Sequence, residues 1–206
     1  MMNRVAIIDY GMCNLDSVQR ALEECGASAT ITDEPADLDH ADRIVLPGVG
    51  AFGDAMARMR ARGLDTALKE LVLGDGVPFL GICLGMQMIA TVGEEGGETP
   101  GLGWIDGVVR RLQPNAVDRR IPHIGWNEVE ARGSSTLLQG IPPRSDFYFV
   151  HSYHLDCDVD ADSAGVTPYC GEFTSVVERG AIFGVQFHPE KSQQHGFRVL
   201  KNFLAY

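Results

Sequence analysis

The chain has 206 residues, of which 45% are hydrophobic and 22% charged, a composition typical of a folded protein with a sizeable core. A formal net charge of -11 makes it a poor candidate for general nucleic-acid binding. No stretch approaches the roughly 20 apolar residues that cross a membrane, and no signal-peptide core is expected. The five widely spaced cysteines include no Cys-x-x-Cys pair, so a disulfide framework or a zinc ribbon is not expected. A reducing cytoplasm fits this chain best.

The first part of the chain alternates short apolar strands with amphipathic helices. Strands are predicted over residues 4–9, 28–32, 43–46 and 77–82, and helices over 15–24, 54–60 and 64–73. This alternation is typical of a parallel sheet covered by helices on both faces. Sites in such sheets lie beyond the carboxyl ends of the strands. The turn 47–50 and Cys83 both fall at such ends, so we expect them to share one crevice.

After residue 93 the pattern changes to short strands. A loop rich in glycine and acid is expected over 94–101, then strands over 104–112, 127–130, 147–150, 170–173, 175–179 and 181–187, with a hairpin turn at Arg179-Gly180 and a last helix over 195–204. We therefore predict an α/β fold. Its mostly parallel central sheet is flanked by helices and carries an additional antiparallel strand region, within a single domain over residues 1–206.

Cys83 stands between two glycines where a predicted strand meets a helix-like pattern. The order strand, Gly81, Cys83, Gly85, helix resembles the Gly-x-Ser-x-Gly elbow, with cysteine in place of serine. The glycines lack a Cβ, which lets strand and helix approach closely. The helix N-terminus favours a thiolate, the reactive form of cysteine. We expect Cys83 to project from the end of the sheet as a nucleophile.

His188 and Glu190 are the candidate partners of this thiol. His188 follows a predicted strand, and residues two apart in an extended segment point to the same side, so Glu190 can orient the imidazole. A nucleophilic thiol needs a base, and the base needs an orienting group. His-Pro-Glu alone equally fits a structural loop. Together with Cys83 it predicts a Cys-His-Glu triad.

Two other motifs have weaker interpretations. The turn 47–50 could aim backbone N–H groups at an oxyanion, or be a plain strand–helix turn; it lacks the Lys-Ser/Thr of a phosphate-binding loop. His151 and His154 suggest a metal site, but His-x-x-His is unspecific, and a crevice-lining loop or a strand end is favoured. No metal is expected.

These motifs resemble those of the class I (triad) glutamine amidotransferases, through Gly81-Ile-Cys-Leu-Gly-Met-Gln87 and His188-Pro-Glu190. Further runs resemble one branch of that class, the glutaminase subunits of imidazole glycerol phosphate synthase: residues 9–15, 47–52, 125–127, 148–153 and 188–193. The resemblance covers essentially the whole chain. The Gly-Trp-Asn run and the His-Pro-Glu-Lys-Ser-Gln run are its more specific signals.

The resemblance implies hydrolysis of L-glutamine to glutamate and ammonia, with no cofactor. Cys83 would attack the side-chain amide, His188 would carry the proton, and Glu190 would orient His188. It implies an oxyanion site formed by Val49, Gly50 and Leu84, and substrate contacts from Gln87, Glu95, His151 and Ser152.

The resemblance also implies a heterodimer with a (β/α)8-barrel cyclase subunit. That partner would use the ammonia to make imidazole glycerol phosphate and an aminoimidazole carboxamide ribotide in histidine biosynthesis, and ligand bound to it would raise glutaminase activity. We expect the switch in the turn 47–50, because glycine reorients an N–H with little steric penalty. An aromatic cluster with a few charges suits the docking face, for which the candidates are Pro122, Trp126, Asn127, Tyr148 and Lys191.

One departure and three alternatives remain. Position 13 is Cys where the family usually has glycine, and Cys13 would be strained if the position requires positive φ. A glutaminase serving another synthase, such as the pyridoxal phosphate or anthranilate systems, is disfavoured by the 125–127 and 191–193 runs. A catalytically silent binding subunit is disfavoured by the intact triad. A cysteine hydrolase or protease is disfavoured by Gln87 and Glu95.

Overall fold

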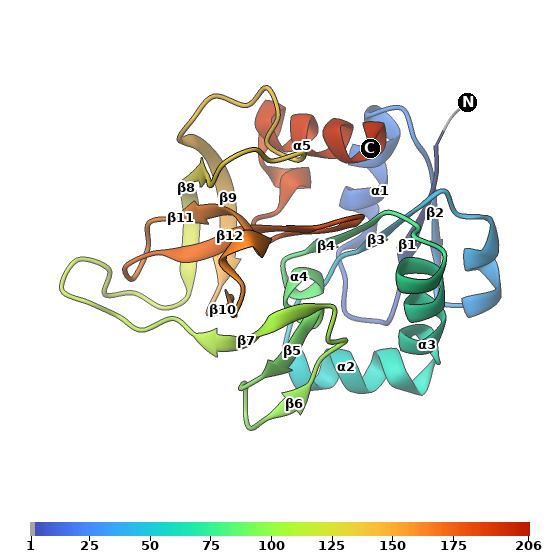
Figure 1. Ribbon diagram of the computed structural model, residues 1–206, viewed down its shortest axis with the longest axis horizontal. Coiled ribbons are helices and arrows are strands. Elements are labelled where there is room, and N and C mark those ends of the chain that lie inside the picture. The colour runs from blue at the N-terminus through green and yellow to red at the C-terminus, as the bar shows by residue number, and fades with distance from the viewer. Residues whose placement is uncertain (1–2) are drawn as a thin grey trace.

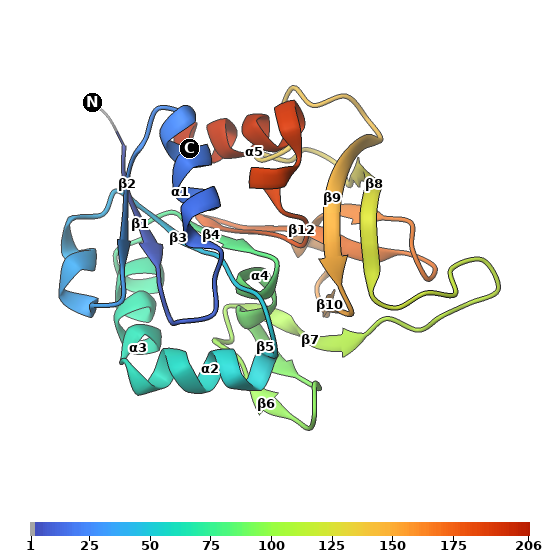
Figure 2. The same cartoon turned by 180° about the vertical axis from the view of Figure 1, so that it is seen from behind.

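The computed structural model describes residues 3–206, and a nine-stranded mixed sheet lies at its centre (Figures 1 and 2). Five neighbouring strands are parallel, in the order β2 (Ser28–Thr32), β1 (Arg4–Ile8), β3 (Arg43–Leu46), β4 (Phe79–Ile82) and β13 (Ile182–Val185). Antiparallel strands continue the sheet, in the order β12 (Phe173–Arg179), β11 (Ser163–Thr167), β8 (His123–Ala131) and β9 (Ser145–His151). The predicted α/β architecture, a parallel sheet with an added antiparallel region, is confirmed.

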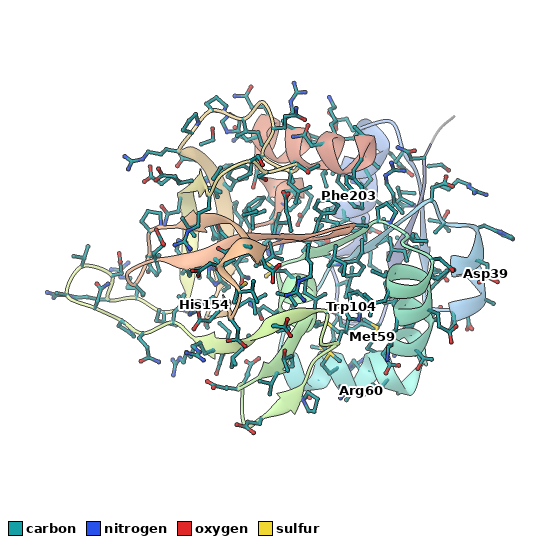
Figure 3. The ribbon with its side chains drawn as sticks, viewed as in Figure 1. Asp39, Met59, Arg60, Trp104, His154 and Phe203 are labelled. Atoms are coloured by element: carbon teal, nitrogen blue, oxygen red, sulfur yellow. The ribbon has the colours of Figure 1, made fainter. Side chains whose placement is uncertain are left out.

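Helices cover both faces of the parallel strands. One face carries α1 (Leu15–Glu24) and α5 (Gln193–Ala205), and the other carries α2 (Phe52–Ala61), α3 (Leu64–Lys69) and η2 (Glu70–Gly74) (Figure 1). Successive residues of β1 alternate between the two cores, because side chains alternate across a strand. Figure 3 shows Phe203 and Met59 on opposite sides of the sheet, and both are completely buried. Burial on both faces explains the near-continuous apolar runs of these strands.

A second, four-stranded sheet lies beside α2 and α4 (Leu84–Met88) (Figure 1). Its strand order is β10 (Tyr153–Cys157), β7 (Ile105–Arg111), β5 (Ala90–Gly93) and β6 (Thr99–Pro100). Three short 3-10 segments connect other elements: η1 (Pro35–His40), η3 (Asp160–Asp162) and η4 (Pro189–Lys191). The start of β10 and the loop after β5 bring polar groups to the carboxyl end of β4, next to Cys83.

Several predicted boundaries differ from those observed. The helix predicted over 64–73 is α-helical only to Lys69 and continues as a π-helix. The predicted hairpin turn at Arg179-Gly180 is confirmed, since Arg179 pairs with Ile182. The strand predicted over 170–173 is wrong, because Cys170 and Gly171 have φ of 56° and 100° and form a turn. The strand begins at Phe173. Strands β5, β6, β10 and β11 were not predicted.

None of the helices formed by residues 3–206 combines the length and apolar character needed to span a bilayer.

Candidate active site

Cys83 occupies a strained turn between β4 and α4. Its φ of 54° and ψ of -109° lie outside the regions that non-glycine residues prefer, at a cost of about 1–3 kcal/mol. The predicted need for glycine on both sides is confirmed: a Cβ on Gly85 would lie 1.8 Å from the Leu46 carbonyl oxygen, and one on Gly81 would lie 2.6 Å from the Gly85 oxygen. The sequence therefore builds the strand–turn–helix elbow around this cysteine.

Two expectations about Cys83 need correction. The residue is only 6% exposed, so it lies in the wall of a cavity that opens to one side and does not project into open space. The helix behind it is only five residues long, so its dipole contributes little to holding a thiolate. Charge stabilisation at Cys83 has to come from neighbouring side chains and backbone groups.

His188 and Glu190 lie side by side as predicted, but Pro189–Lys191 form the 3-10 turn η4 and not the extended segment that was expected. His188 Nδ1 is 2.9 Å from Glu190 Oε1, and both side chains are almost fully buried. The backbone of His188 is fixed from two directions: its N–H donates to the Tyr148 carbonyl oxygen at 2.9 Å, and its own carbonyl accepts from Ser192 Oγ at 2.7 Å. His188 Nε2 is buried and has no hydrogen-bond partner among residues 3–206. The carboxylate thus holds one ring nitrogen while the other is left for proton transfer.

The electrostatic surroundings favour a charged His188. Burial lowers its pKa, but interactions with Cys83 and Glu190 outweigh burial and raise the pKa to about 10. A protonated imidazole between a carboxylate and a cysteine is an arrangement that can stabilise a thiolate and then supply a proton to a leaving amine. Chemically, these three residues can carry out nucleophilic acyl transfer.

Cys83 opens onto a cavity of about 290 Å³, a size suited to a small metabolite. The structure brings every predicted oxyanion and substrate residue to the wall of this cavity, namely Val49, Gly50, Leu84, Gln87, Glu95, His151 and Ser152. Pro122, Val150 and Tyr153 complete the lining. The turn 47–50 and Cys83 therefore share one crevice, as predicted from their positions at strand ends.

The turn 47–50 is held by the loop after β1. The N–H of Val49 donates to the Met12 carbonyl oxygen at 2.9 Å, and the thiol of Cys13 donates to the Pro47 carbonyl oxygen at 3.3 Å. Gly50 has a φ of 102°, which only glycine adopts easily. The strain considered for Cys13 is not found, because its φ is not positive. In this conformation the Val49 N–H is engaged and not available to an oxyanion.

The polar groups of Gln87 and Glu95 are also partly engaged within the chain. Gln87 Nε2 donates to the Tyr153 carbonyl oxygen at 2.8 Å and to Gln186 Oε1 at 3.0 Å. Since both hydrogens of that nitrogen are used, its carbonyl oxygen is the atom left for a ligand. Glu95 Oε2 accepts from the N–H of Phe52 at 2.8 Å, at the start of α2. Both residues offer acceptor oxygens at the cavity wall.

A chain of three side chains supports the cavity wall from behind. Asn127 Nδ2 lies 3.2 Å from His123 Nε2, His123 Nδ1 lies 3.0 Å from His151 Nε2, and His151 Nδ1 lies 2.9 Å from the Tyr153 carbonyl oxygen. A carbonyl only accepts, so His151 carries its proton on Nδ1, and His123 must then donate from its own Nδ1. Burial lowers the pKa of His151 to about 3 and of His123 to about 4. With both histidines neutral, every donor in this series of hydrogen bonds faces an acceptor.

Sequence reasoning missed His123 and Gln186. His123 begins β8 and stacks on Tyr169, with ring centroids 3.9 Å apart. Gln186 is completely buried beside Cys83. The sequence did contain one signal for Gln186, since it is the only amide in the apolar run 181–187. A polar side chain buried in such a run requires hydrogen-bond partners, which marks it as a candidate site residue. His151 and His154, the second of which is labelled in Figure 3, line separate cavities. Among residues 3–206, no group of three or more His, Cys, Asp or Glu side chains is arranged to hold a metal ion.

Four of the five predicted docking residues lie on β8, β9 and η4, and Pro122 directly precedes β8. Trp126 is 48% exposed and meets Tyr148 edge-on, with ring centroids 6.0 Å apart, and Lys191 Nζ lies 5.8 Å above the Tyr148 ring. Ile124, which was not predicted, is 61% exposed on the same strand as Trp126. Asn127 instead turns inward: its amide binds His123 and the Pro168 carbonyl, and its oxygen accepts from the N–H of Glu128.

Comparison with known proteins places this site in a class. The family described as Glutamine amidotransferase class-I matches residues 6–205, so the chain belongs to the class I glutamine amidotransferases. Solved structures with the same fold include a glutamine amidotransferase (TM-score 0.74, 18% identity, 98% of this chain and 97% of that one) and PurLQS from Thermotoga maritima (TM-score 0.75, 19% identity, 100% and 99%).

Closer relatives identify the branch. The chain is 48% identical over 202 residues to "Imidazole glycerol phosphate synthase subunit HisH" of Moorella thermoacetica, covering 98% of this chain and 94% of the relative. It is 46% identical over 200 residues to subunit HisH 1 of Campylobacter jejuni, covering 97% and 98%. Within the class, the chain therefore belongs to the HisH family. The resemblance drawn from the sequence motifs is confirmed.

Proposed function

We propose that this chain hydrolyses L-glutamine to glutamate and ammonia as the glutaminase subunit of an imidazole glycerol phosphate synthase. The observation that carries the proposal is the elbow cysteine, which opens onto a small polar cavity and lies beside a buried His188–Glu190 pair. Membership of the HisH family supports the choice of this synthase over the other glutamine-dependent systems.

The proposed reaction proceeds through a thioester. The sulfur of Cys83 attacks the side-chain amide carbon of glutamine and forms a tetrahedral species with a negatively charged oxygen. His188, charged at neutral pH because of its raised pKa, gives its proton to the amine nitrogen as the carbon–nitrogen bond breaks and ammonia leaves. His188 then takes a proton from the water that attacks the thioester. The carbon–sulfur bond breaks, glutamate leaves with its carboxyl proton lost to solvent, and the thiolate of Cys83 beside a protonated His188 is restored. Glu190 keeps the imidazole oriented throughout.

The cavity lining assigns roles to the remaining residues. The N–H of Leu84 at the start of α4 would be one oxyanion donor. A second would come from the turn at Val49 and Gly50, once the Val49 N–H leaves the Met12 carbonyl oxygen. The acceptor oxygens of Gln87 and Glu95 suit the α-ammonium group of glutamine. The backbone of His151 and Ser152 forms the facing wall.

The proposed partner is a (β/α)8-barrel cyclase subunit that consumes the ammonia. The relatives are named as subunits of a synthase, so a second subunit is part of the proposal. Pro122 lines the cavity and directly precedes β8, which carries exposed Trp126 beside Tyr148 and Lys191, so a subunit docked on this face could receive ammonia without release to solvent. We place the reaction in a reducing cytoplasm, since the nucleophilic thiol must stay reduced.

Substitution of Cys83 by alanine tests the proposal. In the reconstituted complex, Cys83→Ala is expected to abolish glutamine-dependent turnover and to leave ammonia-dependent turnover intact, because only the thioester route is lost. Cys25→Ala is the matched control and is expected to leave both rates unchanged, since Cys25 lies near Phe197 on the α5 side of the sheet. Normal glutamine use by Cys83→Ala would remove the nucleophile assignment.

A further inference from the structure

Gln186 contacts the proposed nucleophile but has no part in the reaction described above. It follows β13, two residues before His188, and its side chain is completely buried. Its Nε2 lies 3.7 Å from Cys83 Sγ, and its Oε1 lies 3.0 Å from Gln87 Nε2. A fully buried carboxamide against a reactive sulfur calls for a physical explanation.

The direction of this amide is fixed by its neighbours. The Tyr153 carbonyl oxygen only accepts hydrogen bonds, so the atom of Gln87 that lies 2.8 Å from it is the amide nitrogen. The second hydrogen of that nitrogen faces Gln186, whose nearer atom must therefore be the oxygen. The nitrogen of Gln186 is consequently turned toward Cys83. His151 also donates to the Tyr153 carbonyl oxygen, which supports its role as the fixed acceptor.

We propose that Gln186 belongs to the catalytic machinery, because its amide N–H donates to Cys83 Sγ and stabilises the thiolate. This inference rests on the proposed function only in taking Cys83 as the nucleophile. A donor to the charged form of an acid favours that form, and a buried donor acts in a low-dielectric setting. The separation of 3.7 Å predicts a moderate effect.

The donor serves two steps of the reaction. Before attack, it stabilises negative charge on the sulfur as the thiol proton passes to His188. During thioester hydrolysis, the carbon–sulfur bond breaks and the electron pair returns to sulfur, which the same N–H again stabilises. Gln186 thereby supplies part of the charge stabilisation that the short helix α4 does not provide.

The inference is tested by the rate at which Cys83 is alkylated in the intact chain. Iodoacetamide reacts with the thiolate, and peptide mass spectrometry reports modification at Cys83 separately from the other cysteines. Gln186→Met removes the donor with little change in volume, and alkylation at pH 7 is expected to slow about five- to tenfold, with the pH profile moved to higher pH. Gln186→Glu keeps an acceptor for Gln87 and removes the amide donor, so the profile should move in the same direction.

Two further measurements separate this role from a structural one. In the complex, Gln186→Met is expected to lower kcat for glutamine more than it raises KM, whereas a residue that only supports Gln87 would mainly raise KM. In the unmodified chain, the Gln186 side-chain amide resonances should shift as Cys83 ionises and should lose that response in Cys83→Ala. An alkylation profile of Gln186→Met that coincides with the unmodified chain, or amide resonances that ignore Cys83, would overturn the inference. Neither result depends on whether Cys83 hydrolyses glutamine.

Discussion

At the scale of single residues, the site depends on which atoms carry protons. His188 holds a proton because Cys83 and Glu190 outweigh its burial, whereas His123 and His151 stay neutral because burial dominates. The three histidines are therefore tuned in opposite directions within one site. The charged His188 lies beside the reacting sulfur, and the neutral His123 and His151 support the cavity wall through hydrogen bonds.

The neutral pair makes stability depend on acid pH. The pKa values of His123 and His151 are about 4 and 3 in the folded chain and about 6.5 when unfolded, so only the unfolded state takes up protons between these values. We expect each histidine to cost on the order of 2 kcal/mol of stability at pH 5 relative to pH 7. His123→Gln, which keeps a donor for His151, should reduce the fall in melting temperature between pH 7 and pH 5. His40→Gln, at an exposed position, is the control, and an equal fall in all three proteins would contradict the account.

Much of the site was predictable at the residue scale, and the limits have a physical cause. Cys83, His188 and Glu190 belong to short local motifs. The glycines around Cys83 predicted its turn, and the two-residue spacing of His188 and Glu190 predicted that these two side chains lie together. Gln186 and His123 were missed because their partners come from distant segments. Gln186 contacts Cys83 at the elbow and Gln87 in α4, and His123 contacts His151 at the end of β9. Asn127 was predicted to contact a partner protein, but its side-chain amide binds His123 and the Pro168 carbonyl oxygen within the chain. The direction of this side chain depends on residues that are distant in the sequence.

At the scale of elements, two loops at the carboxyl ends of β1 and β3 determine the state of the oxyanion site. Residues 10–13 hold the turn 47–50 through the Met12 carbonyl oxygen, the Cys13 thiol and the Tyr10 hydroxyl, which packs against Gly48. A turn that is hydrogen-bonded at Pro47 and Val49 and closely packed at Gly48 resists reorientation. The free chain is accordingly expected to hydrolyse glutamine slowly.

Substitution of Cys13 tests whether the contacts of residues 10–13 restrain the turn 47–50. Removal of its hydrogen bond to the Pro47 carbonyl oxygen by Cys13→Ala should favour release of the turn, and partner-free glutaminase activity is expected to rise about two- to fivefold. Ammonia release in the absence of the cyclase measures this directly. Cys25→Ala should behave as the unmodified chain does. Unchanged or lower activity in Cys13→Ala would show that this thiol does not restrain the turn.

The elements themselves were predicted unevenly. Strands β1, β3 and β4 are buried on both faces and therefore read as apolar runs that the sequence displays clearly. Strand β11, with the sequence Ser-Ala-Gly-Val-Thr, begins with three small residues that do not indicate a strand, although it is entirely buried. Cys170 and Gly171 have positive φ and form a turn. The residue pattern over 170–173 resembled a strand and gave no sign of this conformation.

At the scale of the whole molecule, the cavity and the exposed aromatic face lie together. Pro122 lines the cavity, and Trp126 and Ile124 are exposed on β8 nearby. Exposed large apolar side chains on one strand are typical of a surface that another protein covers. A partner docked on this face would close the cavity mouth and could act on the turn 47–50 at the same time.

The docking surface is tested by calorimetric titration with the cyclase subunit. Trp126→Ala removes the largest exposed aromatic side chain of the face, and affinity is expected to fall about 10- to 100-fold. Leu73→Ala is a suitable control, because Leu73 is similarly exposed but lies in η2 and not on β8, β9 or η4. Equal affinities for the two variants would remove Trp126 from the centre of the interface.

The central claim is that Cys83 forms a covalent intermediate with glutamine when the cyclase is bound. Acid quenching of the complex during turnover, followed by peptide mass spectrometry, measures this most directly. The account predicts a glutamyl thioester on the peptide that contains Cys83, and none on the peptides with Cys13, Cys25, Cys157 or Cys170. Continued glutamine hydrolysis with no adduct on Cys83, or with the adduct on another cysteine, would contradict it.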